Sequence, residues 1–143
     1  MFDSILVVCR GNICRSPIGE RLLRAAFPLK NISSAGVSAL VGMPADKKAI
    51  QVSSEHGLLL DGHISRQITS ELCRRNDLIL VMEKELVEAV CHFSPEVRGK
   101  TMLFGHWNNQ IDIADPYHKS REAFEYIYRL LDDSAQKWVK ALS

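Results

Sequence analysis

The sequence predicts a single α/β domain over residues 1–143, built as a three-layer sandwich in which helices flank a central parallel sheet of four strands. Three observations support this fold class. Apolar segments of strand length alternate with segments whose apolar residues recur at helical spacing. The clearest strand segments are apolar throughout, as expected for strands buried on both faces of a sheet. The chain of 143 residues is also long enough to bury one sizeable core.

The first half of the chain contains two expected strands and two expected helices. A continuous apolar run predicts the first strand at 4–9 (SILVVC), and helical spacing of apolar residues predicts a helix over 17–27 (PIGERLLRAAF). A short second strand is expected at 31–37 (NISSAGV). A turn and a helix closed by a glycine follow over 42–57.

The middle of the chain repeats this alternation. The segment 66–76 (RQITSELCRRN) is expected to form a short helix, and the apolar run 77–82 (DLILVM) a third strand. A helix follows over 83–93, and SPEVRG at 94–99 is expected to break it.

The last part of the chain completes the predicted sheet. A fourth strand is expected at 100–105 (KTMLFG), followed by a polar loop without clear periodicity over 106–119. A long amphipathic helix over 120–142 has an apolar stripe, which predicts one buried side. In sheets of this kind, ligands bind beyond the carboxyl ends of the strands, where Cys9 stands.

Composition excludes several functional classes. The formal net charge is +1, so the chain has no overall charge suited to nucleic acid or to a membrane surface. No apolar run approaches the ~20 residues of a membrane span, and the N-terminal residues do not form a signal peptide, so a cytoplasmic protein is expected. The four cysteines and five histidines lack the spacing of a metal site, and neither a disulfide framework nor a cofactor is expected.

The segment that joins the first strand to the first helix, CRGNICRS at 9–16, has the residues of an oxyanion-binding loop. Successive backbone N–H groups in such a loop can surround one oxyanion, and the positive end of the helix dipole adds to the attraction. Gly11 is expected to adopt a backbone conformation that other residues resist, and Asn12 tolerates the left-handed region. Arg15 offers a planar pair of donors for two phosphate oxygens. The Gly-Lys-Ser/Thr ending of a nucleotide-binding loop is missing.

A thiol stands at the base of this loop. The helix start and nearby arginines favour the thiolate form of Cys9. Ser16 and Pro17 suit the N-cap and the first position of the helix, and the Ser16 hydroxyl can also donate to the thiolate. A thiolate beneath a bound phosphate is placed for in-line attack on phosphorus, which gives a phosphocysteine intermediate that water later hydrolyses.

Such chemistry also needs an acid. An ester oxygen leaves phosphorus faster when it is protonated. The polar segment 106–119 contains two candidates, Asp112 and Asp115. The residues alone do not choose between them, although a rigid Asp-Pro followed by Tyr117 favours Asp115.

Two motifs carry a resemblance to a known family. VCRGNICRSP at 8–17 resembles the signature of the low-molecular-weight protein tyrosine phosphatases, and DPY at 115–117 resembles the general-acid loop of that family. The resemblance covers essentially the whole chain. KTMLFGHW (100–107) and DPYHKSREAFE (115–125) are most similar to bacterial members that accompany tyrosine autokinases of capsule and exopolysaccharide export. The resemblance implies a monomeric tyrosine phosphatase with such a membrane autokinase as its partner and no nucleic-acid ligand.

The resemblance also implies roles for individual residues. The implied catalytic residues are Cys9, Arg15, Ser16 and Asp115. The implied substrate-binding residues are Arg10, Gly11, Asn12, Ile13, Cys14, Leu40 and Tyr117. Ile13, Leu40 and Tyr117 are expected to wall a deep slot that selects aryl esters, and relatives that cleave phosphoarginine have threonine in place of Ile13. Arg10 departs from the family's small or apolar residue, and its charge is expected either to favour acidic substrates or to have no role.

Further residues are implied around the loop. The family holds the loop asparagine by hydrogen bonds with a serine and a histidine, which correspond here to Asn12, Ser34 and His63. Cys14 is expected to form a reversible disulfide with Cys9 under peroxide, as it does in the family.

Two other functions share parts of this pattern. A thiol-dependent arsenate reductase shares the fold and loop, but it needs further cysteines that relay a disulfide. Cys73 and Cys91 are separated by a predicted strand and half a helix, and are expected to be structural. A non-catalytic phosphotyrosine- or anion-binding module has no use for a nucleophilic thiol with a positioned acid.

Overall fold

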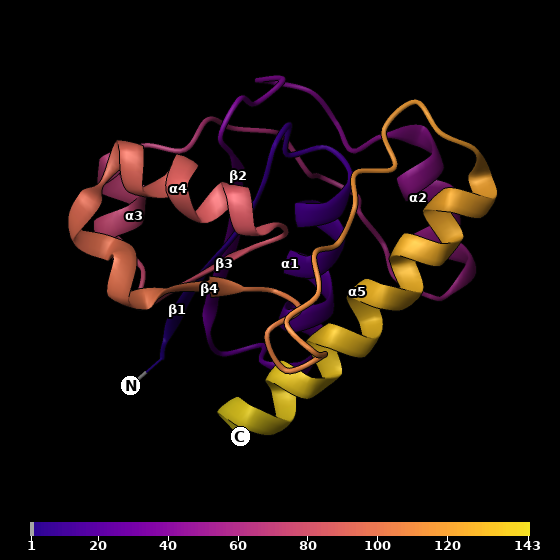
Figure 1. Ribbon diagram of the computed structural model, residues 1–143. Coiled ribbons are helices and arrows are strands. Elements are labelled where there is room, and N and C mark those ends of the chain that lie inside the picture. The colour runs from indigo at the N-terminus through magenta and orange to yellow at the C-terminus, as the bar shows by residue number, and fades with distance from the viewer. Residues whose placement is uncertain (1) are drawn as a thin grey trace.

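The computed structural model describes residues 2–143, whose strands form a parallel sheet in the order β2-β1-β3-β4 (Figure 1). The strands are β1 (Ser4–Cys9), β2 (Asn31–Gly36), β3 (Leu78–Val81) and β4 (Thr101–Leu103). β1 pairs with both β2 and β3, and β3 pairs with β4. The predicted α/β fold with four parallel strands is therefore confirmed.

Helices cover both faces of the sheet and give the predicted three layers (Figure 1). The helices are α1 (Arg15–Ala26), α2 (Lys47–Glu55), α3 (Ser70–Arg75), α4 (Lys84–Phe93), the 3-10 helix η1 (Pro95–Lys100) and α5 (Arg121–Leu142). On one face α1 contacts β1 and β2, and α5 packs along α1 and α2. On the other face α3 contacts β1, while α4 contacts β3 and β4.

The core lies between these layers. Residues Ile5 to Val8 of β1 and all of β3 are buried, which agrees with their uninterrupted apolar sequence. The long helix α5 buries six of the seven residues of the stripe predicted for it, Phe124, Ile127, Tyr128, Leu131, Ala135 and Trp138. The seventh, Leu142 at the end of the helix, is only partly buried. The ring N–H of Trp138 donates to the carbonyl oxygen of Phe104 at 2.9 Å, so the buried indole has a partner.

Two helix starts differ from the sequence-based expectation. α1 begins at Arg15 with Cys14 as its N-cap, and no side chain caps it. The prediction that Ser16 is the N-cap is therefore wrong, because the Ser16 hydroxyl contacts the Cys9 sulfur instead. The helix predicted over 66–76 is shorter, since Thr69 caps α3 by accepting the N–H of Leu72 at 3.2 Å.

Two connecting segments are more ordered than their sequence indicates. Residues 94–99 were expected only to break a helix, but most of them belong to η1. The Thr101 hydroxyl donates to the carbonyl of Val97 at 2.8 Å and closes this turn onto β4. The expected loop over 106–119 contains turns at 106–110 and 117–118, and a bridge between Gly105 and Ile111 ties it to the sheet end.

The carboxyl ends of the strands bring the first loop close to β2. Gly36 ends β2, and a Cβ there would lie 2.5 Å from the carbonyl oxygen of Arg10 and 3.0 Å from the nitrogen of Asn12. Only glycine therefore permits this approach of two backbones.

No helix within residues 2–143 has the length and apolar character needed to cross a membrane.

Candidate active site

A cavity of about 180 Å³ lies where β1 passes into α1. Its lining residues are Cys9, Arg10, Gly11, Ile13, Cys14, Arg15, Ser38, Leu40, Asp115 and Tyr117. The structure thus brings together nine of the residues singled out in the sequence, from segments far apart along the chain. Ser38 was not predicted. Asn12, Ser16, Ser34 and His63 are absent from this lining and are buried.

Cys9 is nearly inaccessible, with 2% of its surface exposed, and it lies at the base of the cavity. Its Sγ is 2.9 Å from the Ser16 Oγ, a hydrogen bond in which either atom can be the donor. Cys9 is the last residue of β1, so its sulfur lies at the carboxyl end of that strand.

Arg15 is the most constrained charged residue at the site, with 1% of its surface exposed. Its Nη1 donates to Glu83 Oε1 and to the carbonyl of Ile113, both at 2.7 Å, and its Nη2 lies 3.6 Å from Asp115 Oδ2. Its Nε and Nη2 have no hydrogen-bond partner among the described residues. These two neighbouring donors can therefore hold two oxygens of one oxyanion.

The electrostatics at Arg15 favour its charged form. Burial disfavours the guanidinium charge, but Cys9, the hydrogen bond to Glu83 and the nearby Asp115 outweigh it, so the pKa of Arg15 is raised. The buried cation is in turn a source of positive potential for an anion in the cavity.

The two candidate acids occupy different places. Asp115 lines the cavity, where its Oδ1 accepts the backbone N–H of Tyr117 at 3.0 Å. Asp112 instead accepts the backbone N–H of Lys84 at 2.9 Å and so satisfies a donor in the first turn of α4. Of the two, only Asp115 lines the cavity with the thiol.

Apolar side chains form the walls of the cavity. Ile13 is buried, whereas Leu40 and Tyr117 are 44% and 37% exposed and stand nearer the opening. The segment that carries Leu40 is fixed to the loop, because the N–H of Leu40 donates to the carbonyl of Gly11 at 3.1 Å. The walls can therefore pack on both sides of a flat ring.

Two loop residues differ in detail from expectation. Gly11 does not adopt a positive φ, so the prediction that it supplies an unusual backbone angle is wrong. Asn12 takes the left-handed conformation instead, with φ of 61°. Arg10 forms an ion pair with Glu85 in the first turn of α4, which partly offsets its charge at the rim.

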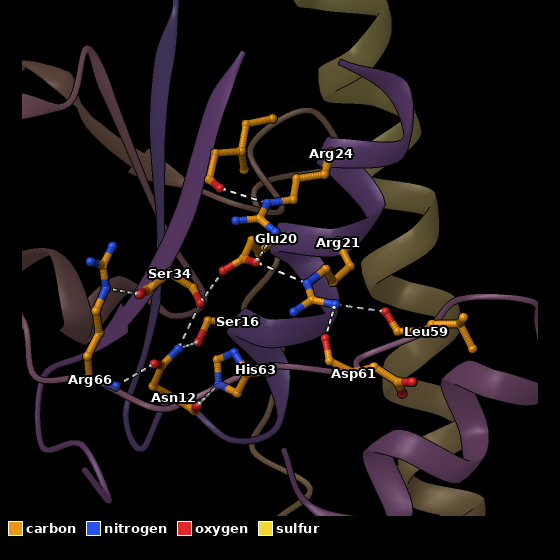
Figure 2. A network of polar contacts seen from close by, with 11 residues as sticks. Asn12, Ser16, Glu20, Arg21, Arg24, Ser34, Leu59, Asp61, His63 and Arg66 are labelled. Carbon is orange, nitrogen blue, oxygen red and sulfur yellow. Dashed lines mark hydrogen bonds and ion pairs between the residues drawn. The ribbon is translucent and has the colours of Figure 1, made fainter. Parts of the chain in front are cut away.

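The hydrogen-bonded cluster behind the loop contains the three residues implied by resemblance (Figure 2). Asn12 Nδ2 donates to Ser34 Oγ at 3.0 Å, and His63 Nε2 lies 2.6 Å from the carbonyl oxygen of Asn12. Two members were not predicted: Glu20 accepts the Ser34 hydroxyl at 2.7 Å, and the N–H of Arg66 donates to Asn12 Oδ1 at 2.9 Å.

Sequence signals for the missed residues exist but are weak. Glu20 is a carboxylate four residues after Ser16, within the segment predicted to form the first helix. Glu83 directly follows the apolar run of the third strand, at a carboxyl end where site residues gather. Neither signal identifies a partner.

The other cysteines are buried thiols. Burial, with smaller contributions from Asp46 and Cys9, raises the pKa of Cys14 well above its ordinary value. Cys73 and Cys91 are buried on α3 and α4, away from the cavity lining. Within residues 2–143, no group of three or more histidine, cysteine or carboxylate side chains is arranged to hold a metal ion.

Comparison with known proteins gives a consistent result. The family model for low molecular weight phosphotyrosine protein phosphatase matches residues 4–143. The probable low molecular weight protein-tyrosine-phosphatase AmsI of Erwinia amylovora is 61% identical over 143 residues, covering 100% of this chain and 99% of the relative. The tyrosine phosphatase Wzb from Escherichia coli K30, solved with sulphate, is 55% identical with a TM-score of 0.98 over 100% of both chains. Vibrio vulnificus Wzb, solved with benzylphosphonate, is 53% identical with a TM-score of 0.97 over 99% of both chains. The chain therefore belongs to the low molecular weight phosphotyrosine protein phosphatase family.

Proposed function

We propose that this protein is a protein-tyrosine phosphatase that hydrolyses phosphotyrosine through a phosphocysteine intermediate. One observation carries the proposal: Cys9, Arg15 and Asp115 line one cavity, and two N–H donors of Arg15 have no hydrogen-bond partner within residues 2–143. A nucleophile, an oxyanion-binding group and an acid are thereby placed around one phosphate-sized space.

In the first step, the Cys9 thiolate attacks phosphorus opposite the ester oxygen. The S–P bond forms as the P–O bond breaks, and Asp115 gives its proton to the departing phenolate oxygen. Arg15 and the loop N–H groups stabilise the charge on the equatorial oxygens, since they are already oriented before the substrate arrives.

In the second step, water attacks the phosphocysteine. Asp115 takes a proton from the water, the S–P bond breaks, and inorganic phosphate and the thiolate are released. Ser16, whose hydroxyl oxygen is 2.9 Å from the sulfur, stabilises the departing thiolate.

The depth of the cavity and its apolar walls support selection of phosphotyrosine. Because Cys9 is almost fully buried, a phosphate must reach it on a long rigid arm, which phosphotyrosine provides and phosphoserine does not. Ile13 and Tyr117 offer apolar surface to the ring. The bound ligand of the Vibrio vulnificus relative, benzylphosphonate, has the same pairing of an aromatic ring with a phosphorus oxyanion.

The rival functions fit the site less well. An arsenate reductase needs cysteines that can relay a disulfide, whereas Cys73 and Cys91 are buried on separate helices outside the cavity lining. A binding module does not require an acid beside a nucleophile.

The proposal extends to the partner. Resemblance of the segments 100–107 and 115–125 to bacterial capsule-associated members supports a membrane tyrosine autokinase as substrate, in capsule or exopolysaccharide production. The enzyme would act on it as a monomer in the cytoplasm. Loss of phosphate from such a kinase on mixing would test the proposed partner. A mass near 16.1 kDa in solution would test the monomeric state.

The direct test measures kcat/KM for a phosphotyrosine peptide beside phosphoserine and phosphoarginine peptides, using EDTA-treated protein. We expect turnover of phosphotyrosine alone, none with Cys9→Ser, and a loss of about 10²–10⁴-fold with Asp115→Asn. Asp112→Asn is the matched control and should retain most activity. Turnover that survives Cys9→Ser would overturn the mechanism, and arsenate reduction with a thiol donor would support the first rival.

A further inference from the structure

Glu20 is a carboxylate enclosed in α1 behind the catalytic loop, with only 5% of its surface exposed (Figure 2). It does not line the cavity. A carboxylate this deeply buried needs paired charges and hydrogen bonds to offset its lost hydration. The identity of its partners therefore indicates why it is there.

The two oxygens of Glu20 face different partners. Oε2 lies 3.2 Å from Arg21 Nε and 3.4 Å from Arg24 Nη1, both cationic donors. Oε1 is 2.7 Å from the Ser34 hydroxyl. Because an ionised carboxylate only accepts hydrogen bonds, Ser34 must give its single proton to Glu20.

This fixes the direction of the next hydrogen bond. With its proton committed to Glu20, Ser34 Oγ can only accept, and it accepts from Asn12 Nδ2 at 3.0 Å. The amide of Asn12 has no freedom to reverse, since its Oδ1 accepts the backbone N–H of Arg66 at 2.9 Å. The second hydrogen of Nδ2 points at Ser16 Oγ, 2.8 Å away.

The directions of these hydrogen bonds also fix the one at the thiol. Ser16 Oγ accepts from Asn12, so the Ser16 proton remains available for the atom on its other side, the Cys9 Sγ at 2.9 Å. We propose that Glu20 is a positioning residue whose carboxylate ends a directional hydrogen-bond chain through Ser34, Asn12 and Ser16, so that Ser16 donates to the Cys9 thiolate. The proposal rests on the proposed function of Cys9 as nucleophile.

The hydrogen-bond chain explains why a carboxylate rather than an amide occupies position 20. In Glu20→Gln, the new NH₂ group must face either the arginines or Ser34. Facing Arg21 and Arg24, it opposes two donors; facing Ser34, it deprives the Ser34 proton of its acceptor and disturbs the alignment of Asn12. Either orientation weakens a chain that leads to the sulfur.

Other charged groups near the hydrogen-bond chain do not take over the role of Glu20. Arg21 and Arg24 balance its charge, and the ring of His63 contacts the backbone carbonyl of Asn12 rather than the Ser34 hydroxyl. At the thiol end, Arg15, Asp115 and Cys14 surround Cys9. Among these groups, only Glu20 accepts the Ser34 proton.

The test measures how fast iodoacetate alkylates Cys9 across a range of pH, a readout that reports the thiolate without needing phosphatase activity. We expect Glu20→Gln to move the alkylation midpoint upward by about one pH unit, and to lower kcat roughly 10-fold. Glu88→Gln is the matched control, because Glu88 also pairs with an arginine, Arg98, but lies exposed on α4. Thermal unfolding of each variant is measured in parallel.

Two further variants separate positioning from general support of the fold. Glu20→Asp keeps the charge beside the arginines but is too short to reach Ser34, so it should shift the midpoint as Glu20→Gln does, even if the latter folds poorly. In a Ser34→Ala background, Glu20→Gln should add no further shift. A folded Glu20 variant with an unchanged alkylation profile, or a shift that persists in Ser34→Ala, would overturn the proposal. Failure of the proposed function would instead appear as wild-type protein that alkylates normally yet hydrolyses no phosphotyrosine.

Discussion

Arg15 Nη1 lies 2.7 Å from Glu83 Oε1, which ties the start of α1 to the residue that follows β3 and Met82. The carbonyl of Ile113 accepts from the same nitrogen. Together they hold the guanidinium from one end, while its Nε and Nη2 have no hydrogen-bond partner among the described residues. The orientation of the oxyanion-binding group thus depends on a carboxylate that does not line the cavity.

Glu83→Ala is therefore expected to impair phosphate binding. Without its partner the guanidinium can rotate, and a small misplacement at a reacting centre costs about 10²-fold in rate. We expect kcat/KM for phosphotyrosine to fall by roughly this factor, and inhibition by inorganic phosphate to weaken. Glu71→Gln, at an exposed ion pair with Arg75, is the control. Normal phosphate inhibition in Glu83→Ala would contradict the role assigned to this contact.

Gly36→Ala is expected to disturb the loop from the side of β2. The added Cβ would lie 2.5 Å from the Arg10 carbonyl oxygen, so one of the two backbones must move. Overpacking of this kind costs about 1–3 kcal/mol, and the loop displacement should lower kcat at least 10-fold. Urea unfolding and steady-state kinetics check the two effects. Gly99→Ala, where a Cβ meets open space, should alter neither.

The elements that the sequence predicted well are those whose burial is uniform. β1 and β3 are enclosed on both faces, so their residues form continuous apolar runs that are visible without a structure. The place of Cys9 follows, because a thiol at the carboxyl end of a parallel strand lies where ligands bind. These features depend only on residues close together in the chain.

The features that the sequence did not predict depend on contacts across the fold. Ser16 fits the local pattern of an N-cap, but Cys9 and Asn12 engage its hydroxyl. The pairing of Arg15 with Glu83 requires that β3 lie beside β1, and this strand order is not readable from alternating segments. The role of a residue was thus predictable where its neighbours in the sequence explain it. Hydrogen-bond partners from distant segments were not predictable.

The ion pair between Arg10 and Glu85 predicts how charge at the rim affects substrates. The side chains of Arg10 and Glu85 are 47% and 65% exposed, so their interaction is screened and modest. Glu85→Gln should free the Arg10 charge and raise kcat/KM about 2–5-fold for phosphopeptides with acidic flanks, while Arg10→Ala lowers it. Both effects should shrink in high salt. Equal changes with p-nitrophenyl phosphate, which has no flanking residues, would show that Arg10 acts in some other way.

His63 predicts a pH dependence of stability. Burial lowers its pKa, an effect that the hydrogen bond with the Asn12 carbonyl and the charge of Glu20 only partly offset. The unfolded state therefore takes up a proton below about pH 6.5 that the folded state resists, so this residue's contribution is complete above that pH. It is lost as the pH falls from there through the lowered folded-state pKa. Urea unfolding across this range should show a smaller loss of free energy for His63→Gln than for wild type. His92→Gln, at an exposed position on α4, should follow wild type, and parallel curves for all three proteins would mean that His63 is not the titrating group.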